Sequence, residues 1–224
     1  MDNSFIINNQ KDSYQAAFIE HGDKPEGTFQ NNTETQYLRF ERLLKNIEPY
    51  FNDKTTIHDV GSGLCDLHNY LTQKKILHTY SGTEIVQEMI DYSLSKYSDI
   101  TISNRDLLDV NAEKYDFVVL SGTLNIKGTL QEELWKEYCE KLILKMFELS
   151  TKAISFNFLT SYRTFSKDDL IYFNPLTIFE HCISNLSRFI ILDHSYPLYE
   201  VTVTVFHEEF LKTNYNVNAF KKYF

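Results

Sequence analysis

Strand-like runs alternate with amphipathic stretches along most of the chain. The runs of strand length are residues 56–60, 79–83, 100–104, 115–120 and 153–158. Between them, apolar residues recur every three or four positions, which is the spacing of one helix face. Such alternation is typical of a parallel sheet with helices on both faces. We therefore predict one α/β domain, Rossmann-like and doubly wound, over residues 1–224.

Two of the expected helices begin with a capping-box pattern. The boxes are Thr33-Glu34-Thr35-Gln36 and Thr129-Leu130-Gln131-Glu132. In this motif a hydroxyl and a carboxylate or amide side chain satisfy each other's free backbone N–H groups. The second box should open a long helix that ends near Leu149. A shorter helix is expected from Lys11 to Glu20.

The pattern changes near the end of the chain. Two strand runs, 189–192 and 200–206, are separated by a short connection. In the second run Val201, Val203 and Val205 alternate with threonines, which suits a strand exposed on one face. We predict an antiparallel C-terminal strand that closes a mostly parallel sheet of seven strands.

Residues 1–32 precede the first predicted strand and are polar and mixed. Gly22, Pro25 and Gly27 favour a loop over a packed element. We expect the segment from Tyr14 to Gln30 to be a mobile lid over the substrate pocket. The alternative is a disordered leader.

A glycine-containing turn, Asp59-Val60-Gly61-Ser62-Gly63, follows the first predicted strand. Glycines at this point let the backbone turn sharply and approach a ligand closely. A dinucleotide-binding loop would place a third glycine where this chain has Asp66, whose carboxylate would repel a pyrophosphate but tolerate a cationic amino group. Glu84 ends the next strand, where its two oxygens could accept both ribose hydroxyls. Asp106 follows the third strand and could accept from an adenine amino group.

At these residues the chain resembles the class I S-adenosylmethionine-dependent methyltransferases, over roughly residues 55–160. The likeness rests on segment 58–63, Glu84, Asp106 and the strand 115–119. It implies S-adenosylmethionine as the cofactor and the following contacts: Asp59, Gly61 and Gly63 around the methionine part, Glu84 on the ribose, Ile85 on the adenine ring and Asp106 on the adenine amino group. Ser121, after the fourth predicted strand, is a further cofactor-binding candidate.

A narrower likeness links the chain to small, largely uncharacterised bacterial methyltransferases. It covers most of the sequence and rests on four segments: 21–22, 36–40, 120–127 and 194–197. This likeness suggests that Gln36 and Arg39 reach the carboxylate of the cofactor, which an arginine can pair bidentately. The alternative is a solvated arginine on a helix face.

Methyl transfer is an in-line displacement that needs the acceptor atom held close and water excluded. In this fold ligands meet at the carboxyl ends of the strands. Candidates for holding the acceptor are Asn125, Lys127, Tyr162 and Arg163. Candidates for the chemical step are His21, Tyr14 and His194. Each histidine has a structural alternative, as a helix-end or turn residue.

Net charge and local sequence limit the classes of molecule that the protein is expected to bind. The net charge of −9 disfavours a nucleic-acid partner, since an acidic surface repels phosphates. Residues 121–124 also lack the Asn/Asp-Pro-Pro-aromatic tetrad of methyltransferases that act on nucleobase amino groups. Lys127 and Arg163 allow an anionic metabolite as acceptor.

No apolar stretch reaches the roughly 20 residues that a membrane helix needs, and the N-terminus lacks a signal-peptide pattern. We expect a cytoplasmic protein without membrane contact. The three scattered cysteines form no CxxC pair and the histidines form no HxxxH pair, so no metal site is expected.

The preferred interpretation is an enzyme that moves a methyl group to an oxygen, less favourably a nitrogen, of a small molecule. One alternative is an NAD-dependent oxidoreductase, against which Asp66 argues. The other is a non-catalytic cofactor-binding protein, against which the set of Asp59, Glu84 and Asp106 argues. The pattern predicts neither the acceptor nor the oligomeric state.

Overall fold

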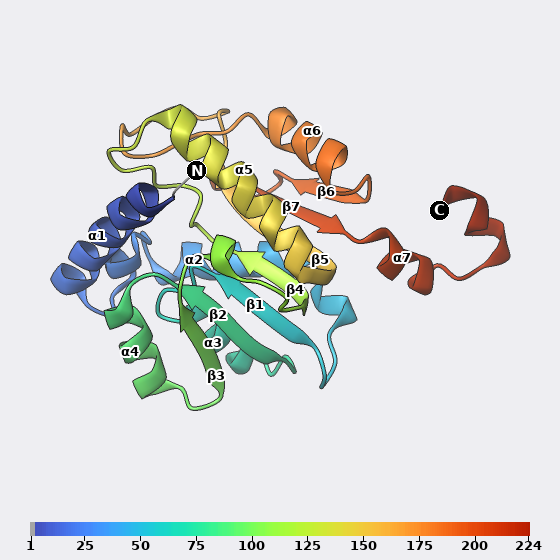
Figure 1. Ribbon diagram of the computed structural model, residues 1–224, viewed down its shortest axis with the longest axis horizontal. Helices are drawn as coiled ribbons and strands as arrows, with labels where there is room; N and C mark the ends of the chain where they lie inside the picture. Colours follow the sequence, from blue (N-terminus) through green and yellow to red (C-terminus); the bar gives the residue numbers. More distant parts are fainter. Residues whose placement is uncertain (1–2) are drawn as a thin grey trace.

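A seven-stranded sheet in the order β3-β2-β1-β4-β5-β7-β6 forms the centre of the computed structural model, which describes residues 3–224 (Figure 1). The strands are β1 (Thr56–Val60), β2 (Thr79–Glu84), β3 (Ile100–Asn104), β4 (Tyr115–Leu120), β5 (Ser150–Leu159), β6 (Ile190–Asp193) and β7 (Glu200–Phe206). Strands β1 to β5 pair in parallel, and β7 runs antiparallel to both β5 and β6. The predicted fold class is therefore confirmed. The first two residues of the expected segment 1–32 lie outside the described range.

Helices cover both faces of the sheet. They are α1 (Ser4–His21), α2 (Thr33–Leu44), α3 (Asp66–Gln73), α4 (Gln87–Lys96), α5 (Glu132–Leu149), α6 (Pro175–Asn185) and α7 (Glu208–Asn214), with short 3-10 turns η1 (Pro25–Thr28), η2 (Glu48–Tyr50), η3 (Leu107–Asp109) and η4 (Asn218–Tyr223). Among the described residues, no helix combines the length and the apolar character needed to cross a membrane.

Two apolar cores, one on each face, hold the layers together. On one face α5 and α6 bury side chains such as Trp135 and Met146 against Phe156 of β5. On the other, α2, α3 and α7 pack with Ile57 and Phe117. The cysteines Cys65, Cys139 and Cys182 are all free and buried.

The two predicted capping boxes do not form. Helix α2 is capped by Asn32, whose side-chain oxygen accepts from the Thr35 N–H at 2.9 Å. Thr33 is already inside the first turn, so its hydroxyl cannot take the cap position. Helix α5 starts after Gln131, which makes no side-chain cap. Its end at Leu149 agrees with the prediction.

Strand β7 is buried on both faces, contrary to the expectation of an exposed threonine face. The threonine side lies beneath α2, where Asn46 donates to the Thr204 hydroxyl at 3.3 Å. The Thr202 hydroxyl is bonded to that of Tyr196 at 2.9 Å. Because both hydroxyls have hydrogen-bond partners, threonine can be buried here in place of an apolar residue without leaving an unsatisfied polar group.

The N-terminal segment is more ordered than the sequence suggested. Helix α1 runs to His21, and Gly22 ends it with a φ of 65°. The part of the expected loop before Gly22 is therefore helical. Asn9 donates to Thr129, just before α5, at 2.8 Å, and Gln15 donates to Glu88 of α4. Helix α1 thus bridges α4 and the approach to α5, as Figure 1 shows.

Candidate functional site

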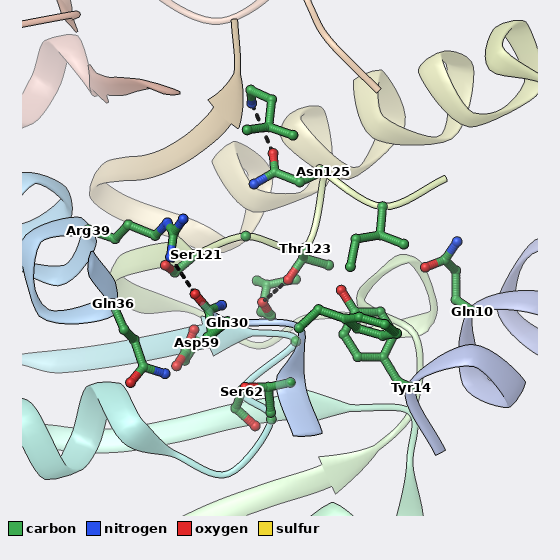
Figure 2. Close-up of a pocket in the computed structure, with 18 of the residues that line it drawn as sticks. Gln10, Tyr14, Gln30, Gln36, Arg39, Asp59, Ser62, Ser121, Thr123 and Asn125 are labelled. Atoms are coloured by element: carbon green, nitrogen blue, oxygen red, sulfur yellow. Dashed lines mark hydrogen bonds between the residues drawn. The ribbon is translucent and has the colours of Figure 1, made fainter. Parts of the chain in front are cut away.

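A cavity of about 530 Å³ opens at the carboxyl ends of the central strands, within the usual size range of small-molecule pockets (Figure 2). Its walls come from distant parts of the chain: α1, the segment 28–31, α2, the turn after β1, the ends of β2 and β3, the segment after β4, α5, and the segments 165–172 and 197–200. In parallel α/β sheets this edge is where ligands bind.

The turn after β1 depends on its glycines. Gly61 has a φ of 66° and Gly63 a φ of 52°, values that favour glycine. A Cβ on Gly61 would lie 2.5 Å from the Thr123 hydroxyl oxygen. Cys65 has a φ of 58°, so this chain completes the turn with a non-glycine residue at a cost of about 1–2 kcal/mol.

Glu84 fixes this turn from the end of β2. Its Oε2 accepts from the Gly63 N–H at 2.8 Å, and its Oε1 accepts from the N–H groups of Ile85 (2.7 Å) and Val86 (3.0 Å). Burial raises the pKa of Glu84, and these three donors oppose the shift. Since each carboxylate oxygen can accept two bonds, Oε2 has room for one more donor.

Asp59, at the end of β1, has a strongly perturbed carboxyl pKa. Burial raises its pKa to about 7, a shift that the Tyr80 hydroxyl opposes and that the negative charges of Glu84 and Asp66 strengthen. Tyr80 donates to Oδ2 of Asp59 at 2.7 Å. Asp66 accepts from the Gln36 amide at 2.9 Å, and its pKa is also raised by burial.

Asp106 completes a group of four carboxyls at this end of the cavity. It caps η3, accepts from Tyr138 at 2.8 Å, and has a pKa raised by burial. Ser62 and Thr83 also line the cavity, and their buried hydroxyl oxygens have no partner among residues 3–224. We call this region, with its four carboxyls, the carboxylate end.

Tyr14 reaches the carboxylate end from α1. Its side chain is half-buried, and its ring meets that of Phe29 edge to face at 5.0 Å. Burial, and the nearby charge of Glu84, raise the pKa of the Tyr14 phenol. The phenol therefore stays protonated near neutral pH, so it can donate a hydrogen bond but does not suit the role of a base.

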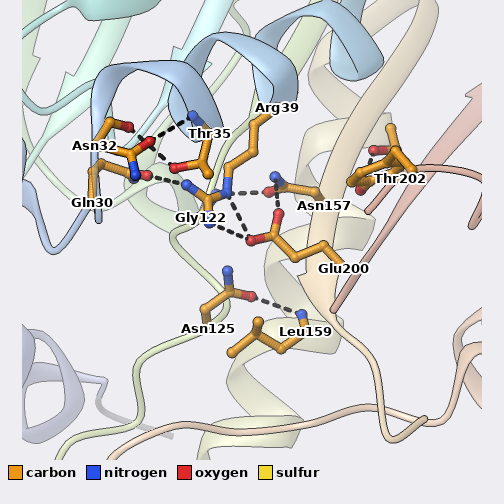
Figure 3. Close-up of polar contacts among 11 residues, drawn as sticks. Gln30, Asn32, Thr35, Arg39, Gly122, Asn125, Asn157, Leu159, Glu200 and Thr202 are labelled. Carbon is orange, nitrogen blue, oxygen red and sulfur yellow. Dashed lines mark hydrogen bonds and ion pairs between the residues drawn. The ribbon is translucent and has the colours of Figure 1, made fainter. Parts of the chain in front are cut away.

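A buried polar network forms the opposite part of the cavity wall (Figure 3). Arg39 donates from Nε and Nη2 to Oε1 of Glu200, both at 2.7 Å, and from Nη1 to Gln30 at 2.5 Å. Oε2 of Glu200 accepts from the Asn157 amide at 3.0 Å, and Asn157 in turn accepts from the Gly122 N–H at 2.7 Å. Arg39 is thus a buried, paired cation, not a solvated one.

The architecture matches solved methyltransferases. Magnesium protoporphyrin IX methyltransferase from Synechocystis PCC 6803, solved with S-adenosylmethionine bound, superposes with a TM-score of 0.62 at 14% identity, over 93% of this chain and 98% of its own. A Leishmania major S-adenosylmethionine-dependent methyltransferase gives 0.66 at 13% identity, over 92% and 85%. At such identities the similarity shows the fold.

A curated relative shows the family. No family model matches the chain. A protein of Mycobacterium tuberculosis named "Putative methyltransferase Rv1506c" is 30% identical over 157 residues, which is 68% of this chain and 93% of the relative. The chain belongs to the class I S-adenosylmethionine-dependent methyltransferases.

The cavity of this methyltransferase gathers most of the candidates from the sequence. Those that line it are Asp59, Gly61, Gly63, Glu84, Ile85, Asp106, Ser121, Gln36, Arg39, Asn125 and Tyr14. Asn125 helps to hold the wall in place, because its side-chain oxygen accepts from the Leu159 N–H at 3.0 Å.

Five candidates are not among the lining residues: His21, His194, Lys127, Tyr162 and Arg163. The Arg163 guanidinium lies 3.7 Å from the ring centroid of Tyr172, and Lys127 donates to the Gly128 carbonyl at 3.4 Å. The ring of Tyr162 lies beside that of His194, 6.4 Å between centroids. The anionic acceptor expected from Lys127 and Arg163 therefore has no support from the geometry of the methyltransferase.

Glu200 is the main site residue that the sequence analysis missed. A signal was present, because a carboxylate opens the otherwise apolar and threonine-rich run 200–206. Buried charges are rare unless they are paired, so a glutamate in a core strand indicates a partner or a ligand. Gln10, also overlooked, lines the cavity from α1, and its buried amide nitrogen has no partner among the described residues.

Proposed function

We propose that this protein transfers a methyl group from S-adenosylmethionine to an oxygen, less favourably a nitrogen, of a small molecule. The observation that carries the proposal is the carboxylate end, where Asp59, Asp66, Glu84 and Asp106 surround the glycine turn. Four carboxyls crowded in a buried site favour a ligand with positive charge and hydrogen-bond donors. They oppose a pyrophosphate, which argues against NAD.

When bound, the cofactor supplies a methyl group on a positively charged sulfur. The chain's own part is to bind, orient and exclude water. In this proposal Glu84 accepts from the ribose with its remaining acceptor position, Asp106 accepts from the adenine amino group, and Asp59 lies beside the methionine part.

Calorimetric titration with S-adenosylhomocysteine tests the cofactor assignment. We expect binding at least about a hundredfold tighter than that of NAD. The pKa of Asp59 is about 7, so Asp59 is neutral below that pH and charged above it. A cationic amino group prefers the charged form, so affinity should fall about tenfold per pH unit below pH 7.

The variant Asp59→Asn provides the control, because it should flatten this pH dependence between pH 5.5 and pH 7. Tighter binding of NAD than of S-adenosylhomocysteine would reject the proposal. That the protein works in the cytoplasm, and without nucleic acid, stays a prediction of the sequence.

We also propose that α1 and the following residues up to Gln30 act as a lid over the cavity. Tyr14 and Gln10 line the cavity from this helix. Hydrogen exchange should therefore slow about tenfold in residues 4–30 when S-adenosylhomocysteine binds, because opening of α1 would expose the ligand.

Helix α6 does not line the cavity and serves as the internal reference for this exchange experiment. Equal exchange of residues 4–30 with and without the ligand, at saturation, would contradict the lid.

A further inference from the structure

The cavity has a second region, formed by the ends of β4, β5 and β7. We call it the acceptor end and define it by Arg39, Asn125, Leu159, Phe165, Lys167, Asp169, Leu170, Tyr172, Leu198, Tyr199 and Glu200. The segment after β5 is tied to the segment after β4, because Ile171 donates to the Asn125 carbonyl at 2.9 Å. In the sheet order, β4, β5 and β7 lie on one side of β1. Strand β2, which ends at Glu84, and strand β3, which precedes Asp106, lie on the other side.

The acceptor end has balanced charge. Its cations are Arg39 and Lys167 and its anions are Glu200 and Asp169. Arg39 is committed to Glu200 by two contacts of 2.7 Å. The third cation of the cavity wall, Arg105, pairs with Glu113 at 2.6 Å.

An anionic acceptor would therefore find no unpaired buried cation at this end, because buried Arg39 is paired with Glu200 and Lys167 is exposed to water. Moving a charge out of water without a counter-charge is strongly unfavourable. A neutral molecule meets no such penalty, so the charge balance favours a neutral acceptor.

Aromatic side chains are partly uncovered at this end. Phe165 is 57% exposed and Tyr199 38% exposed, although both line the cavity and their rings meet edge to face at 5.3 Å. The Tyr172 ring, also on the wall, is backed by the Arg163 guanidinium. Adjacent exposed aromatics beside a cavity are typical of a surface that an apolar or aromatic ligand covers.

Glu200 retains one hydrogen-bond acceptor position. A carboxylate has about four such positions, two on each oxygen. Arg39 fills both on Oε1, and Asn157 fills one on Oε2. The remaining position on Oε2 belongs to a buried residue of the cavity wall, so it suits a donor on a ligand.

We propose that the acceptor end binds a neutral, largely aromatic small molecule whose hydroxyl or amine donates a hydrogen bond to Oε2 of Glu200. This inference rests on the proposed methyl transfer, for which it names the class of acceptor. Arg39 and Asn157 are positioning residues here, because they hold the Glu200 carboxylate in one orientation.

Three naphthalene probes test the class of acceptor on the full chain. They are 2-naphthol, 2-methoxynaphthalene, which lacks the donor, and 2-naphthoate, which is anionic. We expect 2-naphthol to bind at least about tenfold more tightly than either of the others, as measured by calorimetry with S-adenosylhomocysteine present. Equal or tighter binding of 2-naphthoate, or no measurable binding of 2-naphthol, would overturn the proposal.

Each probe is also titrated without S-adenosylhomocysteine. Failure of S-adenosylhomocysteine to bind would count against the proposed function alone, because the order of the three probes still reports on the acceptor end. The two hypotheses can therefore fail separately.

Variants test the Glu200 contact itself. Glu200→Gln leaves Arg39 as a buried unpaired cation, so the paired variant Arg39→Met with Glu200→Met is made as well, which removes both charges together. In the paired variant 2-naphthol and 2-methoxynaphthalene should bind within about twofold of each other. The control Glu209→Gln changes an exposed glutamate on α7 and should keep the tenfold preference. A tenfold preference that survives in the paired variant would overturn the Glu200 contact.

Discussion

Replacing Gly61 with valine should abolish binding of S-adenosylhomocysteine, with a loss of more than about a hundredfold, or about 2.7 kcal/mol. The new Cβ would lie 2.5 Å from the Thr123 hydroxyl oxygen, and the φ of 66° is unfavourable for a β-branched residue. Either the turn shifts or Thr123 moves into the cavity. Calorimetry gives the loss of affinity, and thermal unfolding shows how much of the fold remains.

Two controls separate the causes of this loss. Gly22→Val places the same side chain at a φ of 65° where no atom lies within 4 Å, so its loss of thermal stability reports the cost of a positive φ without a steric contact. Gly61→Ala combined with Thr123→Ala removes the hydroxyl oxygen and leaves the Thr123 Cβ at 3.4 Å, an ordinary contact. Normal affinity in a folded Gly61→Val protein would show that the turn does not contact the cofactor.

Replacing Glu84 with alanine should weaken S-adenosylhomocysteine binding by roughly 1.5–3 kcal/mol, or about tenfold to 150-fold. It should also lower stability, because the N–H groups of Gly63, Ile85 and Val86 lose their shared acceptor. Glu84 therefore supports the glycine turn, in addition to its proposed contact with the ligand.

Glu84→Gln is the informative companion. Its single carbonyl oxygen can still accept from Ile85 and Val86, so most of the stability should return while affinity stays low. Glu180→Gln changes an exposed glutamate on α6, outside the cavity, and is the matched surface control. Affinity equal to wild type in Glu84→Ala would remove Glu84 from the cofactor site.

The residues of the carboxylate end were predictable because their positions depend on local pattern. Glycines or an acidic residue that directly follow a strand of a parallel sheet lie at the carboxyl edge of that sheet, and this placement does not depend on the rest of the chain. Asp59, Gly61 and Glu84 therefore reach the cavity as expected, and the order of strands follows from their alternation with helices.

The acceptor end was not predictable in the same way, because its side chains depend on tertiary packing. Lys127 and Arg163 follow strands β4 and β5, yet Arg163 turns to the Tyr172 ring instead of the cavity. The threonines of β7 suggested a solvent face because nothing local reveals that α2 covers them. To predict the ion pair of Arg39 with Glu200, one would need to know the register of β7 against β5. No sequence pattern within β5 or β7 indicates this register.

The Arg39–Glu200 pair also constrains how the molecule can be built. The two residues are 161 positions apart, so their contact closes one of the longest loops in the chain. Contacts of such sequence separation form late, after the entropy of loop closure has been overcome. During synthesis, the charge of Arg39 on α2 stays without its partner until β7, the final strand, has been made. A shortened chain that ends before β7 would therefore lack the floor of the acceptor end and leave an uncompensated guanidinium in its place.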